Sequence, residues 1–352
     1  MSFMSTVPHL SLRFLGVSIL IGSSLILSRA EAQQGQIIYD TVYGKSLENN
    51  LVGDPPRRST IVYLPPSYEQ SQKRYPVVYL LHGNGAINLI WLNGRLQNFN
   101  ILTAMDSLIR TGKVKEMIIV MPDANNRFRG SHYANSSVTG NWLDFIAKDL
   151  VESIDQKYRT IASSSSRGLA GHSMGGRGSL NIAMKSPGVF GAVYAMSAGV
   201  MAFDSFPPVA EADWRKIIES PTATDNASIR VLGLTAAHSP NPQVKPLLVD
   251  FPYEIVNGNL KRRDTIWQKW LEHDPFHVAR TKSANLRQLR GLAFDVGTSD
   301  MLLSANRLLS DLLRSHGILH QFEEYDGDHI NRIGERLVTR MLPFFSQTLV
   351  AR

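Results

Sequence analysis

Continuous apolar runs that end at small or polar residues constrain the fold of this chain more than any other feature. A run of this kind is typical of a strand buried on both faces, as in a parallel sheet. The alternating segment 318–325 predicts a sheet edge, and 36–43 and 59–64 predict outer strands. The four runs are "PVVYLLHG" at 76–83, "MIIVMPD" at 117–123, "GAVYAMSA" at 191–198 and "RGLAFDVG" at 290–297.

Helical patterns separate these strands. Leu143, Ile146 and Leu150 recur at spacings of three and four, which predicts a helix over 142–158. Two further helices are predicted at 301–314 and from 331 to at least 341. Strands that alternate with helices indicate an α/β fold, a mostly parallel sheet with helices on both faces.

Residues 201–280 break this alternation. The segment is rich in proline and carries Trp267 and Trp270. An insertion that covers one end of the sheet as a cap would have such a composition, since pocket-forming segments lie where the strands of an open sheet end. We expect a cap-like insertion; an ordinary surface excursion is the alternative.

The N-terminus predicts export. A polar start with His9 and Arg13 leads into the apolar run 14–27, which is followed by Ala-Glu-Ala at 30–32. This is the pattern of a cleaved signal peptide over residues 1–32, and the run is short for a transmembrane helix. The expected location is the periplasm or the medium, without a stable membrane span after cleavage. An uncleaved N-terminal anchor is the alternative.

Composition excludes several classes of protein. The chain of 352 residues is 43% hydrophobic and 19% charged and has no cysteine, so a disulfide or a cysteine-linked lipid is impossible. Removing residues 1–32 takes away two arginines and one glutamate and lowers the formal charge from +7 to +6. The densest basic cluster is "KRR" at 261–263. This cluster is shorter than the basic surface stripe that binds nucleic acid, so we expect no nucleic-acid partner. The oligomeric state is left open.

"GHSMG" at 171–175 fits the pattern G-x-S-x-G. The pattern alone is weak, but here a strand-like "RGLAG" precedes it and a plausible helix, 177–185, follows. Strand, sharp turn and helix are the setting in which a serine such as Ser173 is exposed as a nucleophile. A Cβ at position 171 or 175 would crowd the turn, which explains the two glycines. The alternative is a flexible glycine-rich loop.

A serine nucleophile needs a base, and in this setting the chain order is Ser, then Asp or Glu, then His. His329, in the loop "DGDHIN", follows the edge strand on the same side of the sheet as Ser173. His316 and His320 belong to the opposite end of that strand. Three more histidines, 238, 273 and 277, fall in the expected cap and could line a pocket.

The acid should follow the strand that ends at Gly297. Asp300 is placed there, whereas Asp295 lies inside the strand and suits a structural hydrogen bond. Asp326 and Asp328 are too close in sequence to the base to be its usual partner.

An ester oxyanion needs two backbone N–H donors. One comes from Met174, the residue after the nucleophile. The other is expected from Asn84, with Gly85 beside it, in the loop after the strand "VVYLLHG". His82 and Gly83 would then shape this loop; a simple turn is the alternative.

Together, "VYLPPSYEQSQKRYPVVYLLHGNG", "IIVMPDANN", "GNWLDFIAKDLVESID", "AGHSMGGRGSL", "DVGTSD" and "GDHI" resemble the esterase-D-like family, which includes S-formylglutathione hydrolases, feruloyl esterase domains and antigen-85 mycolyltransferases. The resemblance spans about residues 36–347. It implies an α/β-hydrolase domain over 33–352 and serine carboxylic ester hydrolysis by Ser173, Asp300 and His329, with Asn84 and Met174 as oxyanion donors. No metal or cofactor is implied.

The natural substrate is left open as a small-molecule or glycan-linked ester. An acyltransferase with the same three residues, a feruloyl- or aryl-ester-specific polysaccharide esterase, and a non-catalytic binding protein are the alternatives. Gly85, Trp142 and His172 are candidate pocket residues, although Trp142 is equally well explained as a helix-packing residue.

Overall fold

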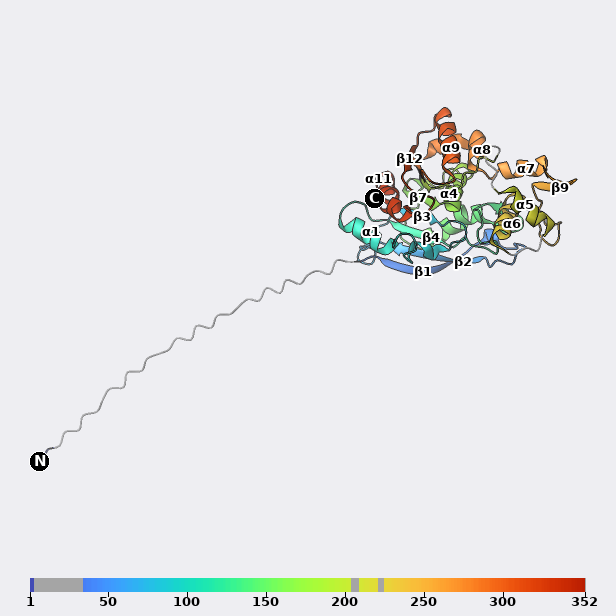
Figure 1. Cartoon of the computed structure of the whole chain (residues 1–352). Coiled ribbons are helices and arrows are strands. Elements are labelled where there is room, and N and C mark those ends of the chain that lie inside the picture. The colour runs from blue at the N-terminus through green and yellow to red at the C-terminus, as the bar shows by residue number, and fades with distance from the viewer. Residues whose placement is uncertain (3–33, 204–208, 221–224, 352) are drawn as a thin grey trace. The chain divides into compact units, whose positions relative to one another are not determined.

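A computed structural model describes residues 1–2, 34–203, 209–220 and 225–351 (Figure 1). The predicted signal peptide therefore lies outside the described residues, apart from Met1 and Ser2. Contacts within the chain gather Gln34–Arg352 into one unit.

The described residues form an eight-stranded central sheet (Figure 1). β1 pairs antiparallel with β2, and β2 antiparallel with β4, while all the other neighbours are parallel. The predicted α/β fold is confirmed, with β12 at one edge. Across the sheet the order is β1 (Gln36–Tyr43), β2 (Arg57–Leu64), β4 (Ile118–Pro122), β3 (Val77–Leu81), β7 (Arg167–His172), β8 (Ala192–Met196), β11 (Gly291–Gly297) and β12 (Gln321–Tyr325).

Helices cover both faces of this sheet, which is why β3, β4 and β8 are buried along their whole length. One face packs in a cluster with α3 (Val151–Lys157), α4 (Met174–Lys185) and α9 (Leu303–Ser315). The other face packs against α1 (Ile101–Arg110), α10 (Ile333–Arg336) and α11 (Leu342–Thr348).

Two of the predicted helices, those over 142–158 and from 331, contain π-helical segments. The helix predicted over 142–158 begins as α2 (Trp142–Asp144), passes through a π-helical segment, Phe145–Leu150, and continues as α3. The last helix is likewise interrupted between α10 and α11 by a π-helical segment, Leu337–Met341, and extends to residue 348. The helix predicted over 301–314, which is α9, matches its predicted range closely.

The segment 201–280 has a hydrophobic cluster of its own, centred on Trp214, Trp267 and Trp270. The cap-like insertion itself stays a prediction. In Figure 1 α5, α6, α7 and β9 gather beside the sheet, away from β12. The described elements are α5 (Glu211–Glu219), α6 (Asn226–His238), the hairpin β9 (Tyr253–Val256) and β10 (Asn259–Arg262), α7 (Asp264–Leu271) and α8 (Pro275–Lys282).

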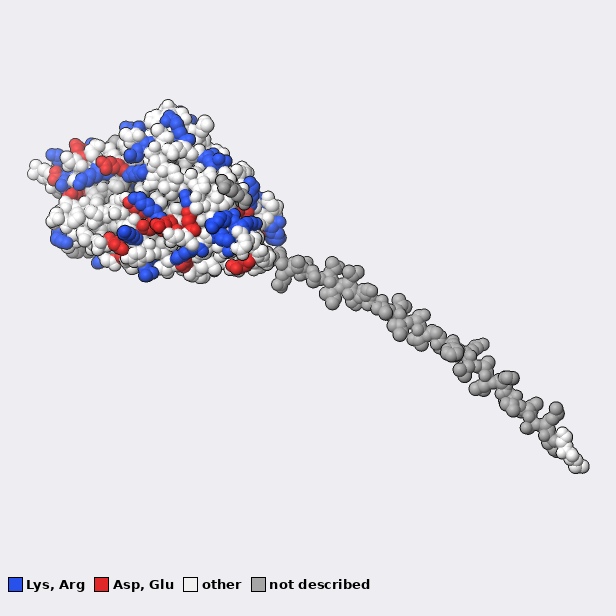
Figure 2. Space-filling model, turned by 180° about the vertical axis from the view of Figure 1, so that it is seen from behind, with Lys and Arg blue, Asp and Glu red and all other residues white. Residues whose placement is uncertain are grey.

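Two surface properties bear on partners. Among the residues that the structure describes, every helix is too short or too polar to cross a bilayer. On the face shown in Figure 2, Lys and Arg side chains are interspersed with Asp and Glu, which is the pattern of a solvated surface.

Candidate active site

Ser173 occupies the sharp turn between β7 and α4. Its backbone has φ 57° and ψ −114°, a conformation that a residue with a side chain rarely adopts. Main-chain hydrogen bonds hold it there: its N–H donates to the Met196 oxygen at 3.0 Å, and its own oxygen accepts from the N–H of Gly199 at 2.9 Å. The turn therefore holds the serine in a strained conformation at the N-terminus of α4.

The two glycines that flank Ser173 have no room for a side chain. A Cβ at Gly171 would lie 2.4 Å from the carbonyl carbon of Gly175. A Cβ at Gly175 would lie 2.2 Å from the main-chain oxygen of Leu81. The steric reason predicted for both glycines agrees with this geometry.

His329 lies between Ser173 and Asp300. Its Nε2 is 2.9 Å from Ser173 Oγ, and its Nδ1 is 2.8 Å from Asp300 Oδ2. A neutral ring that donates from Nδ1 to the carboxylate presents an unprotonated Nε2 to the serine hydroxyl. The His329 side chain is 30% exposed whereas that of Asp300 is 0% exposed, so solvent reaches the histidine but not the carboxylate.

Asp300 belongs to the loop that follows β11. Burial alone would raise its pKa, but hydrogen bonds from His329 and from the Leu302 N–H, the latter at 2.9 Å, keep the pKa below its usual value. The Thr298 N–H donates to the Tyr325 oxygen at 2.8 Å, which ties this loop to the end of β12. The carboxylate is thus held ionised beside the histidine.

The other carboxylates considered for the acid serve other contacts. Asp295 accepts hydrogen bonds from Arg336 Nε at 2.8 Å and from the Tyr194 hydroxyl at 2.7 Å, the structural use predicted for it. Asp328 Oδ1 accepts from the Ile330 N–H at 2.8 Å within its own loop. The remaining downstream histidines also contact other groups: His238 stacks on His273, His277 lies 3.9 Å from Asp274, His316 bonds Ser283, and His320 bonds Ser310.

The loop after β3 lies against the serine. A Cβ at Gly83 would be 3.3 Å from Ser173 Cβ, so the main chain passes directly beside Ser173. The Gly85 N–H is already used, because it donates to the Arg129 oxygen at 2.7 Å. Within the described residues, neither the Asn84 N–H nor the Met174 N–H has a protein acceptor. These two donors therefore remain for a bound group.

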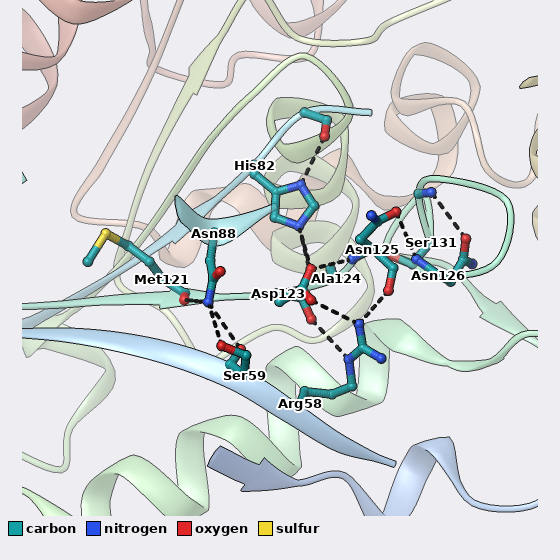
Figure 3. A network of polar contacts seen from close by, with 12 residues as sticks. Arg58, Ser59, His82, Asn88, Met121, Asp123, Ala124, Asn125, Asn126 and Ser131 are labelled. Carbon is teal, nitrogen blue, oxygen red and sulfur yellow. Dashed lines mark hydrogen bonds and ion pairs between the residues drawn. The ribbon is translucent and has the colours of Figure 1, made fainter. Parts of the chain in front are cut away.

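His82 fixes the orientation of the peptide that carries the Asn84 N–H (Figure 3). Its Nδ1 donates to the Gly83 oxygen at 2.9 Å, and its Nε2 accepts from the Ala124 N–H at 2.9 Å. The Gly83 oxygen and the Asn84 N–H belong to one planar trans peptide and point in opposite directions. A hydrogen bond that holds the oxygen therefore also aims the N–H. Sequence reasoning assigned His82 to shaping this loop but not to this contact.

Asp123 and Arg58 anchor the far side of this network (Figure 3). Arg58 Nη2 lies 3.2 Å from Asp123 Oδ2 and also donates to the Asn125 oxygen. Burial would raise the pKa of Asp123, but the hydrogen bond from the Asn125 N–H and the charge of Arg58 keep the pKa below its usual value. The loop beside Ser173 is thus tied to the ends of β2 and β4.

His172 contacts the histidine of the site. Its Nε2 donates to the main-chain oxygen of His329 at 2.8 Å, and the two rings lie 4.9 Å apart. Burial, followed by the neighbouring His329, lowers the pKa of His172 to about 4, so its ring is neutral near pH 7. The sequence suggested a pocket residue, which stays a prediction; in the structure this side chain is 8% exposed and contacts the main chain of His329.

The two other candidate pocket residues differ in their surroundings. Trp142 is 1% exposed, donates from Nε1 to the Thr139 oxygen at 2.8 Å and lies under Arg58, which favours the helix-packing interpretation. Gly85 lines a surface groove beside the loop after β3.

A family model described as "Putative esterase" matches residues 55–338, a range that contains Ser173, Asp300 and His329. The chain belongs to this esterase family. The membership agrees with the resemblance that the sequence motifs indicated.

Relatives of this esterase carry related names. Esterase Rv1288 of Mycobacterium tuberculosis is 28% identical over 275 residues, which is 77% of this chain and 52% of the relative. The chain therefore spans about half the length of that relative. An endo-1,4-beta-xylanase/feruloyl esterase of Xylanibacter ruminicola is 33% identical over 144 residues, 39% of this chain and 19% of the relative.

Solved structures show that the fold is that of an α/β-hydrolase. A ferulic acid esterase is 25% identical, with a TM-score of 0.64 over 90% of this chain and 100% of its own. An S-formylglutathione hydrolase from Staphylococcus aureus is 17% identical, with a TM-score of 0.58 over 89% of this chain and 99% of its own. The second likeness concerns the fold alone.

Proposed function

We propose that this chain is an exported serine esterase that hydrolyses carboxylic esters, with Ser173 as nucleophile, His329 as base and Asp300 as the acid that orients it. One observation carries the proposal: Ser173 Oγ, the His329 ring and Asp300 Oδ2 form a chain of hydrogen bonds of 2.9 and 2.8 Å. These three residues come from three separate loops at one end of the sheet, as the mechanism requires.

In the proposed reaction His329 Nε2 takes the proton of the Ser173 hydroxyl while Oγ bonds to the ester carbonyl carbon. The carbonyl oxygen becomes an oxyanion, which accepts hydrogen bonds from the Asn84 and Met174 N–H groups. Asp300 stabilises the imidazolium that forms. His329 then gives its proton to the departing alcohol as the C–O bond breaks, which leaves an acyl group on Ser173.

Water completes the cycle. His329 removes a proton from water, the hydroxide oxygen attacks the acyl carbon, and the proton returns to Ser173 Oγ as the carboxylic acid leaves. An acceptor other than water would make the same enzyme an acyltransferase.

Feruloyl or other aryl esters linked to a glycan are the narrower substrate class that we favour. The likeness to a ferulic acid esterase at 25% identity and to a xylanase/feruloyl esterase supports this choice. Residues 1–32 supply the export signal in this proposal, which N-terminal sequencing of the protein secreted by an expressing cell would test.

Hydrolysis of 4-nitrophenyl esters and of methyl ferulate tests the proposed esterase function. Purified protein should release 4-nitrophenol and ferulate, and a fluorophosphonate probe should label Ser173. A protein that reacts with neither the esters nor the probe would be a binding protein. Formation of a glycerol or glycan ester, rather than free acid, would identify the acyltransferase.

A further inference from the structure

A groove of about 280 Å³ opens beside the loop after β3. One wall consists of Asn84, Gly85, Phe128 and Arg129, and the other is the start of α6, including Ile229 and Arg230. Asn84, the proposed oxyanion donor, lines the groove, so the groove adjoins one residue of the proposed site.

The described residues that line the groove include two arginines and no carboxylate. Arg129 Nη1 donates to Asn226 Oδ1 at 2.5 Å, a neutral partner, and no carboxylate of the described residues pairs with Arg129. Arg230 Nη2 forms an ion pair of 3.4 Å with Asp213 Oδ2, a residue outside the groove, and solvent exposure of both side chains weakens this pair. The groove is therefore positively charged.

The start of α6 adds to this potential. α6 has 13 residues, and the N–H groups of its first turn have no acceptors within the helix. The Asp225 carboxylate caps the helix by accepting the Ser228 N–H at 3.3 Å, and it lies 2.8 Å from Lys216 Nζ, so the Asp225–Lys216 pair adds no net charge at this end. The partial positive charge of the helix end and the two arginines thus act in the same direction.

Arg129 is held firmly although its side chain is exposed. Its φ of 63° is rare for a residue with a side chain, and the loop maintains it through bonds from the Arg129 N–H to the Asn126 oxygen and from Gly85 to the Arg129 oxygen. Phe128 and Ile229 add hydrocarbon to the lining of the groove. The groove therefore fits a ligand group with a short apolar chain that ends in a negatively charged group.

We propose that this groove binds a carboxylate carried by the ester substrate, on its acyl or its alcohol part, and that Arg129 and Arg230 determine this preference. The inference rests on the proposed esterase function. Exposed ion pairs are individually weak, so the two arginines together should favour an anionic over a neutral ester by about three- to ten-fold in kcat/KM.

Two matched pairs of esters test the proposal. In the acyl pair, mono-4-nitrophenyl adipate carries a carboxylate where 4-nitrophenyl hexanoate has none. In the alcohol pair, 4-acetoxybenzoate is compared with its methyl ester. The readout is the ratio of kcat/KM for the anionic ester to that for the neutral one, so the intrinsic reactivity of each ester cancels when variants are compared.

In the double variant Arg129→Gln/Arg230→Gln, the ratio of kcat/KM for the anionic ester to that for the neutral ester should fall about three- to ten-fold in one of the two pairs. The pair in which the ratio falls identifies the part of the ester that enters the groove. Added NaCl should lower the ratio of the unaltered protein but not that of the double variant. Arg127→Gln, which removes an exposed arginine that does not line the groove, is the control. If the double variant unfolds at a much lower temperature than the unaltered protein, the single variant Arg230→Gln replaces it in this comparison.

Unchanged ratios in the double variant, or an equal fall in Arg127→Gln, would overturn the subsite while leaving the esterase function standing. Failure of the unaltered protein to cleave any of the four esters would instead contradict the esterase function, and the subsite with it.

Discussion

His172 Nε2 donates a hydrogen bond of 2.8 Å to the main-chain oxygen of His329, so the residue before the proposed nucleophile holds the backbone of the proposed base. The loop that carries His329 follows the edge strand β12. The contact therefore links the base to the turn that carries Ser173.

Replacing His172 should impair the base without removing it. His172→Leu loses the donor, and a small displacement of His329 should lower kcat by roughly 10- to 100-fold with little change in KM. His172→Gln, whose amide nitrogen can reach the position of Nε2, should recover part of that loss. The measurement is kcat per site reactive to a fluorophosphonate. Equal losses in both variants would indicate a role in stability alone.

Substitution of Ser173 should separate activity from stability. Ser173→Ala and Ser173→Gly both remove the hydroxyl and should lower kcat by about 10⁴-fold or more. Glycine tolerates φ 57° whereas alanine does not, so the glycine variant should be more stable than the alanine variant by about 1–2 kcal/mol. Urea unfolding of the two variants measures the difference, and equal stabilities would argue against strain at this turn.

Asp300→Asn should lower kcat by about 10⁴-fold, because an amide that donates to Nδ1 favours the tautomer with its proton on Nε2, which cannot accept from Ser173. Asp326→Asn and Asp328→Asn are matched controls in the loop of the base, and they should retain most of the activity. Steady-state kinetics with a 4-nitrophenyl ester compares the three. A comparable loss in Asp328→Asn would reassign the acid.

His82→Leu should weaken the proposed oxyanion site. Without the bond to the Gly83 oxygen, the Asn84 N–H is no longer aimed, and kcat should fall by up to about 10²-fold. Asn88→Ala is the control, because Asn88 Nδ2 bonds the Ser59 and Met121 oxygens in the same region without contacting Gly83 (Figure 3). That variant should lower the melting temperature yet keep kcat per labelled site.

Acid should destabilise the fold through buried neutral histidines. Burial lowers the pKa of His132 to about 3 and that of His172 to about 4, and it holds the pKa of His238 well below its usual value. The unfolded chain, with pKa values near 6.5, then binds more protons below that pH, so these groups stabilise the fold above pH 6.5 and lose their contribution as the pH falls.

Each of these histidines should contribute a slope of about 1.4 kcal/mol per pH unit between pH 6 and pH 5. His238→Phe should reduce the total slope by about that amount. Urea unfolding at pH 7, 6 and 5 provides the comparison, and an unchanged slope in the variant would mean that His238 is charged in the folded protein.

The sequence was sufficient for features that follow from local patterns and chain order. Burial on both faces makes a strand uniformly apolar, so the positions of β3, β4, β8 and β11 could be predicted, and strand order then brought Ser173 and His329 to one end of the sheet. The bonds from His82 to Ala124 and from His172 to His329 could not be predicted, because they depend on how separate loops meet. The positive groove was missed for the same reason, since its two arginines are about a hundred positions apart.

The segment 201–280 joins β8 to β11, and none of Ser173, Asp300 and His329 belongs to it, yet its helix α6 forms one wall of the groove. A stretch from a related esterase could replace it while the proposed reacting groups stayed at the sheet. Divergence in this family can therefore proceed by exchange of a single contiguous module, and chimeras made at the ends of β8 and β11 are a direct route to altered ester selectivity.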